Sequence, residues 1–321
     1  MILVLRALGI GDLATAVPAL RGLRRAFPDR VLALAAPSWL APLVDLIGGV
    51  DRLLPLGGLQ LPAWRVPSPY RAVNLHGRGP ESHRLLRATA PERLWAFRCP
   101  EAGHVDGPIW IEGEHEVHRW CRLLRWYGVP SDPGDLALRP PTVDSPIGVT
   151  VLHPGGKAPE RRWPAERFGV VARELAARGH RPVVTGSQAE RPLAERVAAV
   201  AGLPPGAVLA GRTGLAELAA IVARARLVIT GDTGVGHLAT AFGTPSVVLF
   251  GPTSPARWGP PADRRWHRAL WSAEAMTSSA GTPPAVTAIG VPEVLAAAVE
   301  VEQAARQLDA PVAVSDAAAA E

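Results

Sequence analysis

Six glycine-containing segments carry most of the charged and hydroxyl side chains that could do chemistry, and each follows a short apolar run. These segments are residues 9–12, 76–79, 153–156, 186–190, 231–237 and 251–253. The apolar runs have the length of buried strands. In open α/β sheets, ligands bind beyond the carboxyl ends of the strands, where glycine lets the backbone approach them closely. Glycine is common in such turns in any case, so it is the accumulation of six that indicates a ligand site.

The segment after the apolar run 227–230 gives the strongest of these signals. Asp232, Thr233, Gly234 and His237 stand where a strand pattern changes to a helical one. Free N–H groups and the helix dipole make a helix N-terminus an anion site, and a threonine hydroxyl adds a donor. The glycine spacing fits neither a P-loop nor a dinucleotide fingerprint. The alternative is that Asp232 only caps the helix.

The N-terminal half offers a carboxylate in an equivalent position. Asp12 follows Gly11 after the apolar run 2–6, and a helical pattern continues to about residue 26. Taken by itself, Asp12 can be interpreted as a simple cap on the first helix. Because proline inside a helix costs about 3 kcal/mol, Pro18 implies that the regular helix begins near Thr15 or bends there.

The order of the predicted elements indicates an α/β fold with two domains. Further strands are expected at 31–35, 72–75, 147–152, 182–185, 207–209, 227–230 and 246–250, and helices at 114–127, 164–178, 189–201, 214–225, 233–242 and 292–308. This alternation is typical of parallel sheets with helices on both faces. Proline accumulates at 139–146, which predicts a linker. We therefore predict an N-terminal domain at 1–142, a C-terminal domain at 143–309 and a disordered tail at 310–321.

Composition narrows the class of protein. The 321 residues are 48% hydrophobic and contain neither a run of about 18 uncharged apolar residues nor a signal-peptide pattern, so we expect a cytoplasmic protein. The formal charge is +5, and Lys157 is the only lysine beside many arginines. This balance suits a protein that handles phosphates or lies near an acidic membrane, whereas nucleic acid is not an expected partner. Cys99 and Cys121 have no disulfide or metal spacing and are interpreted as structural thiols.

Two further features have competing interpretations. His115 and His118 flank Glu116 with the wrong spacing for a zinc helix, so no metal site is predicted. Residues 95–126 are rich in tryptophan and arginine. This stretch either contacts a membrane or lipid acceptor or packs in the core with its arginines reaching solvent.

In their order along the chain, these motifs resemble glycosyltransferase family 9, the ADP-heptose:lipopolysaccharide heptosyltransferase-like enzymes. The resemblance rests on Arg6-x-x-x-x-Gly11-Asp12 with Pro18-Ala19-Leu20, on 161–168, on 186–190, on Asp232-Thr233-Gly234-x-x-His237 and on Phe250-Gly251-Pro252-Thr253. It covers most of the chain. It implies a GT-B architecture, in which two Rossmann-like doubly wound parallel-sheet domains face each other across a cleft. It also implies an inverting, metal-independent transfer of a sugar, with no cofactor.

On the donor side, the resemblance implies that the C-terminal domain binds a nucleotide-diphospho-sugar, with ADP-heptose as the family's commonest donor. Thr233, Gly234 and His237 would contact the diphosphate, and Asp232 would lie beside the sugar. Glu190 would accept hydrogen bonds from the ribose. Arg161 stands where the family commonly has lysine, and its planar fork makes a different phosphate contact from an ammonium group.

On the acceptor side, the resemblance implies that Asp12 is the general base for an acceptor hydroxyl. The acceptor is a glycolipid, another glycan or a small molecule, and peripheral membrane contact is an open expectation. Gly11 is also expected on the acceptor side. From their position at or after the end of the predicted strand 72–75, His76, Arg78 and His83 are expected to face the acceptor, the alternative being that these are incidental surface side chains. Two alternatives remain: a nucleotide-sugar epimerase or hydrolase of the same fold, and a non-catalytic sugar-nucleotide-binding module.

Overall fold

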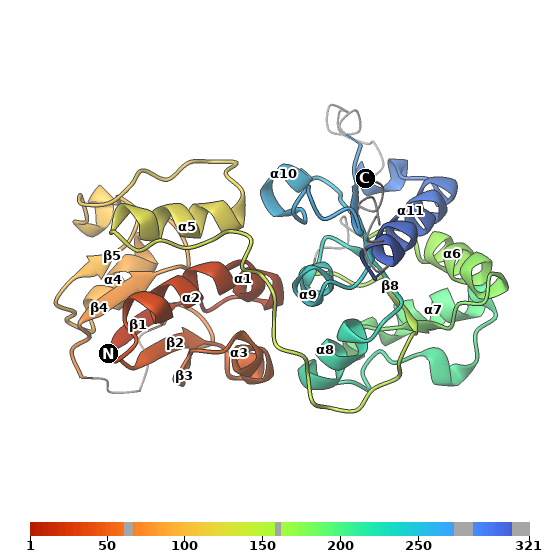
Figure 1. Cartoon of the computed structure of the whole chain (residues 1–321), viewed down its shortest axis with the longest axis horizontal. Helices are drawn as coiled ribbons and strands as arrows, with labels where there is room; N and C mark the ends of the chain where they lie inside the picture. Colours follow the sequence, from red (N-terminus) through yellow and green to blue (C-terminus); the bar gives the residue numbers. More distant parts are fainter. Residues whose placement is uncertain (61–66, 158–161, 273–284, 310–321) are drawn as a thin grey trace, which may run out of the picture.

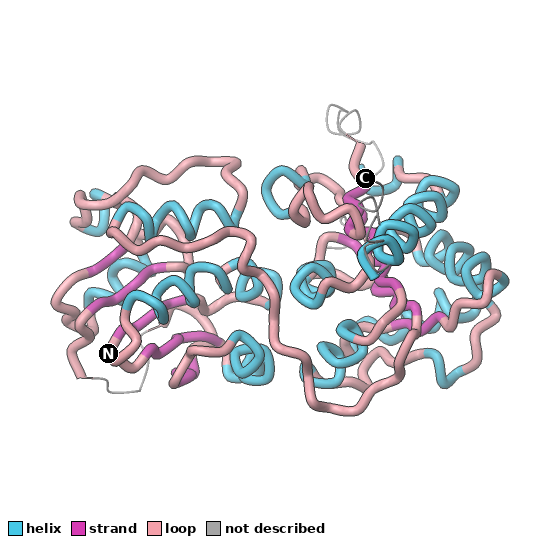
Figure 2. The backbone as a smooth tube through the Cα atoms, in the orientation of Figure 1, coloured by secondary structure: helices cyan, strands magenta, loops and turns pink. Residues whose placement is uncertain are grey.

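The computed structural model describes residues 1–60, 67–157, 162–272 and 285–309, which form two α/β domains (Figure 1). Each domain contains one five-stranded parallel sheet, and the two sheets are separate. Helices flank the strands of both sheets (Figure 2). The central strand β1 (Ile2–Leu5) is entirely buried, as a strand covered on both faces must be. No helix in these ranges is long and apolar enough to span a membrane.

The first sheet has the strand order β3-β2-β1-β4-β5. Its other strands are β2 (Leu32–Ala36), β3 (Arg52–Pro55), β4 (Arg71–Asn74) and β5 (Leu94–Trp95). The helices are α1 (Ile10–Thr15), α2 (Val17–Ala26), α3 (Ala41–Ile47), α4 (Glu81–Arg87) and α5 (Glu116–Trp126). Pro18 lies in the first turn of α2, where no hydrogen bond is lost, so the predicted break falls at Ala16 between two helices.

The second sheet has the strand order β10-β9-β8-β6-β7. Its strands are β6 (Thr150–His153), β7 (Pro182–Val184), β8 (Leu227–Gly231), β9 (Ser246–Leu249) and β10 (His267–Leu270). The helices are α6 (Ala165–Ala177), α7 (Arg191–Ala201), α8 (Leu215–Ala223), α9 (Gly234–Phe242), α10 (Pro255–Trp258) and α11 (Val291–Asp309).

One predicted strand is wrong. Residues 207–209 form only the end of a short 3-10 turn, Pro205–Ala207, and a single bridge from Val208 to Val184. The N–H groups of Ala207 and Val208 donate to the carbonyl oxygens of Pro204 and Pro205 within this turn, so of the three residues only Leu209 donates to the neighbouring strand. The predicted tail 310–321 lies outside the described residues, and the boundary at 142/143 stays a prediction.

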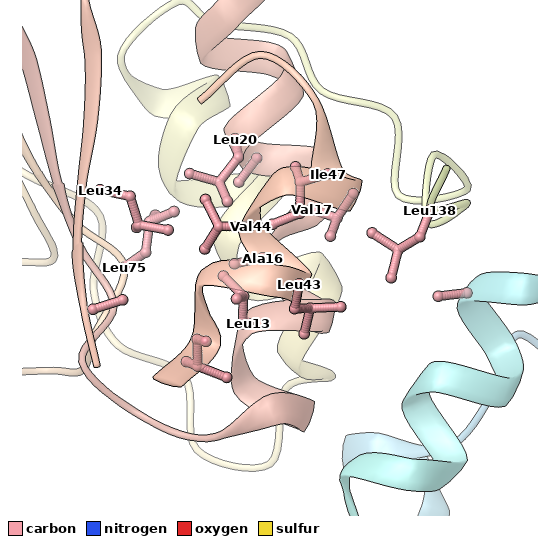
Figure 3. Close-up of a cluster of buried hydrophobic side chains, with 14 of the residues drawn as sticks. Leu13, Ala16, Val17, Leu20, Leu34, Leu43, Val44, Ile47, Leu75 and Leu138 are labelled. Atoms are coloured by element: carbon pink, nitrogen blue, oxygen red, sulfur yellow. The ribbon is translucent and has the colours of Figure 1, made fainter. Parts of the chain in front are cut away.

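A hydrophobic cluster connects the two domains. Figure 3 shows leucine, valine and isoleucine side chains of α1, α2 and α3 packed against the first sheet. Leu138, from the segment that leads out of the first domain, lies between this cluster and a helix of the second domain. Its N–H donates to the carbonyl oxygen of Ala241 in α9 at 3.0 Å. The outgoing segment therefore belongs to the contact between the domains.

The strand order places two loops of each sheet at a topological switch point, where ligands of such folds bind. In the first sheet, β1 pairs with β2 on one side and with β4 on the other, so the loops after β1 and β4 diverge. In the second sheet, β6 pairs with β7 on one side and with β8 on the other, so the loops after β6 and β8 diverge. These four loops carry most of the predicted site residues.

Candidate donor and catalytic site

The N-termini of α1 and α9 meet where the two domains touch. A Cβ atom built on Gly11 would lie 2.6 Å from Cδ2 of His237, and one built on Gly234 would lie 2.6 Å from Cβ of Ile10. Both distances are shorter than any real side-chain contact, so glycine at positions 11 and 234 is what permits this approach. Gly234 therefore faces the opposite domain, a role that the sequence did not indicate.

Asp12 lies in the first turn of α1 at this contact. Its Oδ2 atom accepts a hydrogen bond from the N–H of Gly9 at 3.0 Å, which closes the first turn. Its Oδ1 atom lies 3.7 Å from Nη2 of Arg6, and the side chain is 30% exposed. Asp12 therefore caps the first turn of α1 while part of its carboxylate stays accessible. The role of a cap and the predicted role of a base do not exclude each other.

Arg6 is the fully buried cation beneath Asp12. Its Nε donates to the carbonyl oxygen of Asp12 at 2.9 Å, and its Nη1 donates to that of Leu75 at the end of β4. Its Nη2 donates to Oε1 of Glu116 at 3.1 Å, and this oxygen also accepts from Nε1 of Trp120 at 3.1 Å. A buried charge is stable only when it is paired in this way. Arg6 thus ties together α1, β4 and α5.

The carboxylate of Asp12 acts electrostatically on two buried histidines, both with a strongly lowered pKa. Burial and, to a smaller extent, the charge of Arg6 lower the pKa of His76 to about 4, although Asp12 opposes the shift. Burial also lowers the pKa of His237 to about 4, against the effect of Asp12. His76 and His237 come from different domains, so the two sides of the interface converge on Asp12.

Thr233 caps α9 and lies beside the loop that follows β6. Its Oγ1 accepts from the N–H of Val235 at 3.3 Å and bonds to Oγ1 of Thr230 at 2.9 Å. A Cβ atom on Gly156 would lie 3.6 Å from Cγ2 of Thr233. The loops after β6 and β8 therefore touch, as the switch point requires. Asp232, the residue before Thr233, is half-buried.

Glu190 connects the loops that follow β6 and β7. Its Oε1 accepts from the N–H of Gly156 at 2.8 Å, while its Oε2 accepts from the N–H and Oγ of Ser187 at 2.7 and 2.8 Å. Burial would raise the pKa of Glu190, but these hydrogen bonds outweigh burial and lower it. A carboxylate has about four acceptor positions, so one remains for a ligand.

Arg162 is a cation that the structure holds against the loop after β6. Its Nε and Nη2 donate to the carbonyl oxygen of Gly156 at 2.8 and 2.5 Å. Arg161, which the resemblance implies as the phosphate contact, lies outside the described residues. Sequence reasoning missed Arg162 because nothing local distinguishes it from its neighbour.

Only some of the residues expected on the acceptor side lie near Asp12. Asp12 acts electrostatically on His76, but the side chain of Arg78 is 70% exposed and pairs with Glu112 at 3.3 Å. The expectation for His83 is wrong, because its ring is fully buried. Its Nε2 donates to the carbonyl oxygen of Phe97 at 2.8 Å, and its Nδ1 accepts from Asn74 at 3.1 Å. His83 is a satisfied core histidine.

His115 is a further histidine of the interface that the sequence did not single out for this role. Its Nδ1 caps α5 by accepting from the N–H of Val117, and its Nε2 donates to the carbonyl oxygen of Gly259 in the other domain at 3.0 Å. Within the described residues, no cluster of three or more histidine, cysteine, aspartate or glutamate side chains could hold a metal ion.

Comparison with known proteins identifies the family. The model of glycosyltransferase family 9 (heptosyltransferase) matches residues 112–281, which is more than half of the chain. The chain belongs to glycosyltransferase family 9. The predicted family is thereby confirmed, and with it the interpretation of the chain as a glycosyltransferase.

Named heptosyltransferases are similar to this family 9 member. Lipopolysaccharide heptosyltransferase 1 of Pseudomonas aeruginosa is 37% identical over 155 residues, which are 46% of this chain and only 42% of that protein. Lipopolysaccharide heptosyltransferase 2 of Salmonella typhimurium is 23% identical over 296 residues, which are 79% of this chain and 83% of that protein.

Solved structures support the predicted GT-B fold. The family 9 glycosyl transferase from Veillonella parvula has a TM-score of 0.77 at 20% identity, with 94% of this chain and 97% of that chain covered. E. coli ADP-heptose lps heptosyltransferase II has a TM-score of 0.73 at 21% identity, with 96% and 99% covered. At such identities the likeness shows the fold of this family 9 glycosyltransferase and no more.

Proposed function

We propose that this family 9 glycosyltransferase transfers a heptose from ADP-heptose to an acceptor hydroxyl, with inversion at the anomeric carbon and without a metal ion. The observation that carries the proposal is the contact between Gly11 and His237. Through this contact, the helix turn that carries Asp12 lies against the N-terminus of α9, which Thr233 caps. The printed names of the relatives, lipopolysaccharide heptosyltransferases, support heptose as the sugar and a glycolipid as the acceptor.

In this proposal the donor lies on the second domain. Its diphosphate binds at the N-terminus of α9, beside Thr233 and His237, where free N–H groups and the helix dipole stabilise negative charge. Asp232 lies beside the sugar, and Glu190 uses its remaining acceptor position for a ribose hydroxyl. Arg161 is the cation that the family resemblance assigns to the phosphates. Fixed dipoles and cations of this kind stabilise the leaving diphosphate in the transition state.

The acceptor lies on the first domain in this proposal. Its hydroxyl oxygen attacks the anomeric carbon while the bond from that carbon to the diphosphate oxygen breaks, and ADP leaves. The hydroxyl proton passes to Asp12 as the base. Gly11 lets the acceptor approach α1, and His76 and Arg78 contact it. The neutral state of His76 suits a group that donates or accepts a hydrogen bond without adding charge.

Metal independence rests on the type of anion site. The predicted phosphate contacts are backbone N–H groups, a threonine hydroxyl and an arginine, and no DxD-type carboxylate pair follows a strand of the second sheet. We also propose a cytoplasmic location, at the inner face of a membrane, because a glycolipid acceptor would be embedded there.

The test is an assay of the purified protein with ADP-heptose alone and with a lipopolysaccharide-core acceptor. We expect ADP release and a heptosylated product only when the acceptor is present, and the same rate in excess EDTA. Turnover of the donor alone indicates a hydrolase or an epimerase. Binding without turnover indicates a non-catalytic module. Loss of activity in EDTA that magnesium or manganese restores would overturn the metal-independent mechanism.

A further inference from the structure

A groove on the outer face of the first domain has no role in the site described above. It has a volume of about 650 Å³ and lies between the last turn of α5 and the loop 105–109. Val105 and Ile109 of the loop and Trp126 of α5 line it, and these residues are 67%, 63% and 58% exposed. Large apolar side chains gathered at such exposure usually mark an interaction surface.

Hydrogen bonds and close packing fix the backbone of the loop 105–109, and this leaves the apolar side chains of Val105 and Ile109 exposed. The N–H of Arg98 donates to the carbonyl oxygen of Pro108 at 2.9 Å, and the hydroxyl of Tyr127 donates to that of Asp106 at 2.8 Å. Gly107 is packed so closely that a Cβ atom there would lie 2.2 Å from the carbonyl oxygen of Ala96. The exposure of Val105 and Ile109 is thus imposed by the fold.

The groove is also basic. Arg98, Arg122 and Arg125 line it, and Asp106 is the one acidic residue among its lining residues. Arg122 is engaged, because its Nε and Nη2 donate to the carboxylate of Glu114 at 2.7 Å. Arg98 and Arg125 have no carboxylate within 4.0 Å in the described part of the chain. Two guanidinium groups therefore line the groove beside the apolar side chains without a direct ion pair, against the single carboxylate of Asp106.

We propose that this groove is a docking surface for an anionic lipid bilayer. Val105, Ile109 and Trp126 enter the interface between headgroups and acyl chains, where tryptophan is favoured, and Arg98 and Arg125 bind lipid phosphates. Charge complementarity favours lipid over protein: Arg98 and Arg125, which have no ion pair, line the same groove as the apolar side chains, and peripheral membrane proteins combine cations and apolar side chains in this way. A guanidinium group also matches phosphate geometry.

The position of the groove suits this role. The same helix, α5, begins beside His115 at the domain interface and ends at Trp126 in the groove. Its 11 residues span about 16 Å, which is within reach of a lipid headgroup and its attached sugars. The link between docking and transfer rests on the proposed glycolipid acceptor, whereas bilayer binding itself needs neither donor nor acceptor.

Co-sedimentation with lipid vesicles tests the proposal on the full chain. We expect binding to phosphatidylcholine vesicles that contain about 30% phosphatidylglycerol, weaker binding at high salt, and little binding to phosphatidylcholine alone. Trp126→Ser should abolish most of the binding, while Trp39→Ser, a 53% exposed tryptophan that does not line the groove, should leave it unchanged. Arg98→Gln and Arg125→Gln should each weaken binding roughly fivefold.

Three outcomes would overturn the docking surface. The wild-type protein binds no anionic vesicle, or Trp126→Ser binds as well as Trp39→Ser, or ultracentrifugation shows a dimer that only Trp126→Ser dissociates. Because Trp126 is exposed, its loss should not unfold the protein, and a melting curve of each variant checks this. Transfer to a soluble acceptor without lipid chains should be the same in both variants, so failure of docking and failure of the proposed activity are distinguishable.

Discussion

Arg6 holds Asp12 from beneath through both its backbone and its side chain. The Nε atom of Arg6 donates to the carbonyl oxygen of Asp12 at 2.9 Å, and Nη2 lies 3.7 Å from the carboxylate oxygen Oδ1. Arg6 has no exposed surface, because it directly follows the buried strand β1. The position of the Asp12 carboxylate is therefore set by the core of the domain as well as by the turn that it caps.

Asp12→Asn tests the proposed base. Asparagine keeps the shape and can still accept from the N–H of Gly9, since it caps helices about as well as aspartate. It cannot take a proton, and a positioned base contributes about 10²- to 10⁴-fold in rate. We expect kcat to fall at least about a hundredfold, with ADP affinity and melting temperature nearly unchanged. Steady-state assays, calorimetry and thermal melts measure these quantities.

The control for this variant is Asp29→Asn, which changes an exposed aspartate of the same domain. It should leave kcat unchanged. Normal turnover of Asp12→Asn would mean that Asp12 is only a cap, and His76 would then be the next candidate for the base. The variant His76→Gln would test that assignment in the same assay.

Thr233→Val tests the proposed diphosphate site. The change removes the cap on α9 and the bond to Thr230, which should cost about 1 kcal/mol of unfolding free energy. It also removes a hydroxyl donor to phosphate, so we expect ADP to bind about tenfold more weakly in calorimetry. Thr89→Val, which removes a side-chain hydrogen bond to Leu86 at the end of α4, is the control and should leave ADP affinity unchanged. Unchanged ADP affinity in Thr233→Val would place the diphosphate elsewhere.

Much of the fold could be predicted because the signals are local. An apolar run followed by Gly11 and Asp12 predicts a strand, a turn and a helix in that order. The apolar run followed by Asp232 and Thr233 predicts the same three elements. Parallel sheets then force the ends of such strands to one edge. The sequence does not indicate the strands β3, β5 and β10, which are edge strands of the two sheets. Strand β5 has only two residues, and strand β10 begins with the polar pair His267-Arg268. Such short or polar runs carry no periodicity.

The parts of the site that could not be predicted are tertiary. Glu116 pairs with Arg6 from 110 positions away, and no spacing rule connects the two residues. The resemblance implies that Gly234 contacts the diphosphate, but its close approach to Ile10 depends on how the two domains meet, which no sequence pattern indicates. The residue type of His83 and its place after a strand are typical of a site residue, and only its burial shows that it belongs to the core.

Glu190→Gln tests the role of the Glu190 carboxylate in the donor loops. The folded-state pKa of Glu190 lies below its ordinary value of 4.5, so its ionised form stabilises the protein above that pH. The stabilisation is lost as the pH falls from about 4.5 through the lowered folded-state value. We therefore expect the wild type to melt at a higher temperature than Glu190→Gln at pH 7, with a difference that shrinks below pH 4.5. A difference that does not depend on pH would show that ionisation of Glu190 is irrelevant.

His237 provides a second pH signature. Its folded-state pKa of about 4 is below the ordinary 6.5, so between these values the unfolded chain binds more protons and stability falls as the pH falls. The imidazole C–H signals of His237, assigned by their loss in His237→Gln, should titrate near pH 4 in NMR spectra. ADP should raise this midpoint, because a nearby diphosphate favours the charged ring. A midpoint near 6.5 without ligand would contradict the burial of His237 at the interface.

Gly11→Ala tests whether the contact between the domains is needed for transfer. The added methyl group would lie 2.6 Å from Cδ2 of His237, so the ring must move or the domains must separate. The residue has no positive φ, so alanine adds no backbone strain there. We expect kcat to fall at least tenfold, because a misplacement of about 1 Å between reacting groups costs up to about a hundredfold in rate. ADP should still bind, since its proposed contacts lie on the second domain.

The matched control is Gly57→Ala, at a position where an added Cβ would meet nothing within 4 Å. It should leave kcat and ADP affinity unchanged. His237→Ala in the Gly11→Ala background removes the clashing ring, so the second substitution should restore closure of the domains, measured by small-angle scattering with ADP bound. Full activity of Gly11→Ala would mean that the distance between α1 and α9 does not limit the reaction, and the proposed placement of Asp12 against the donor would then be wrong.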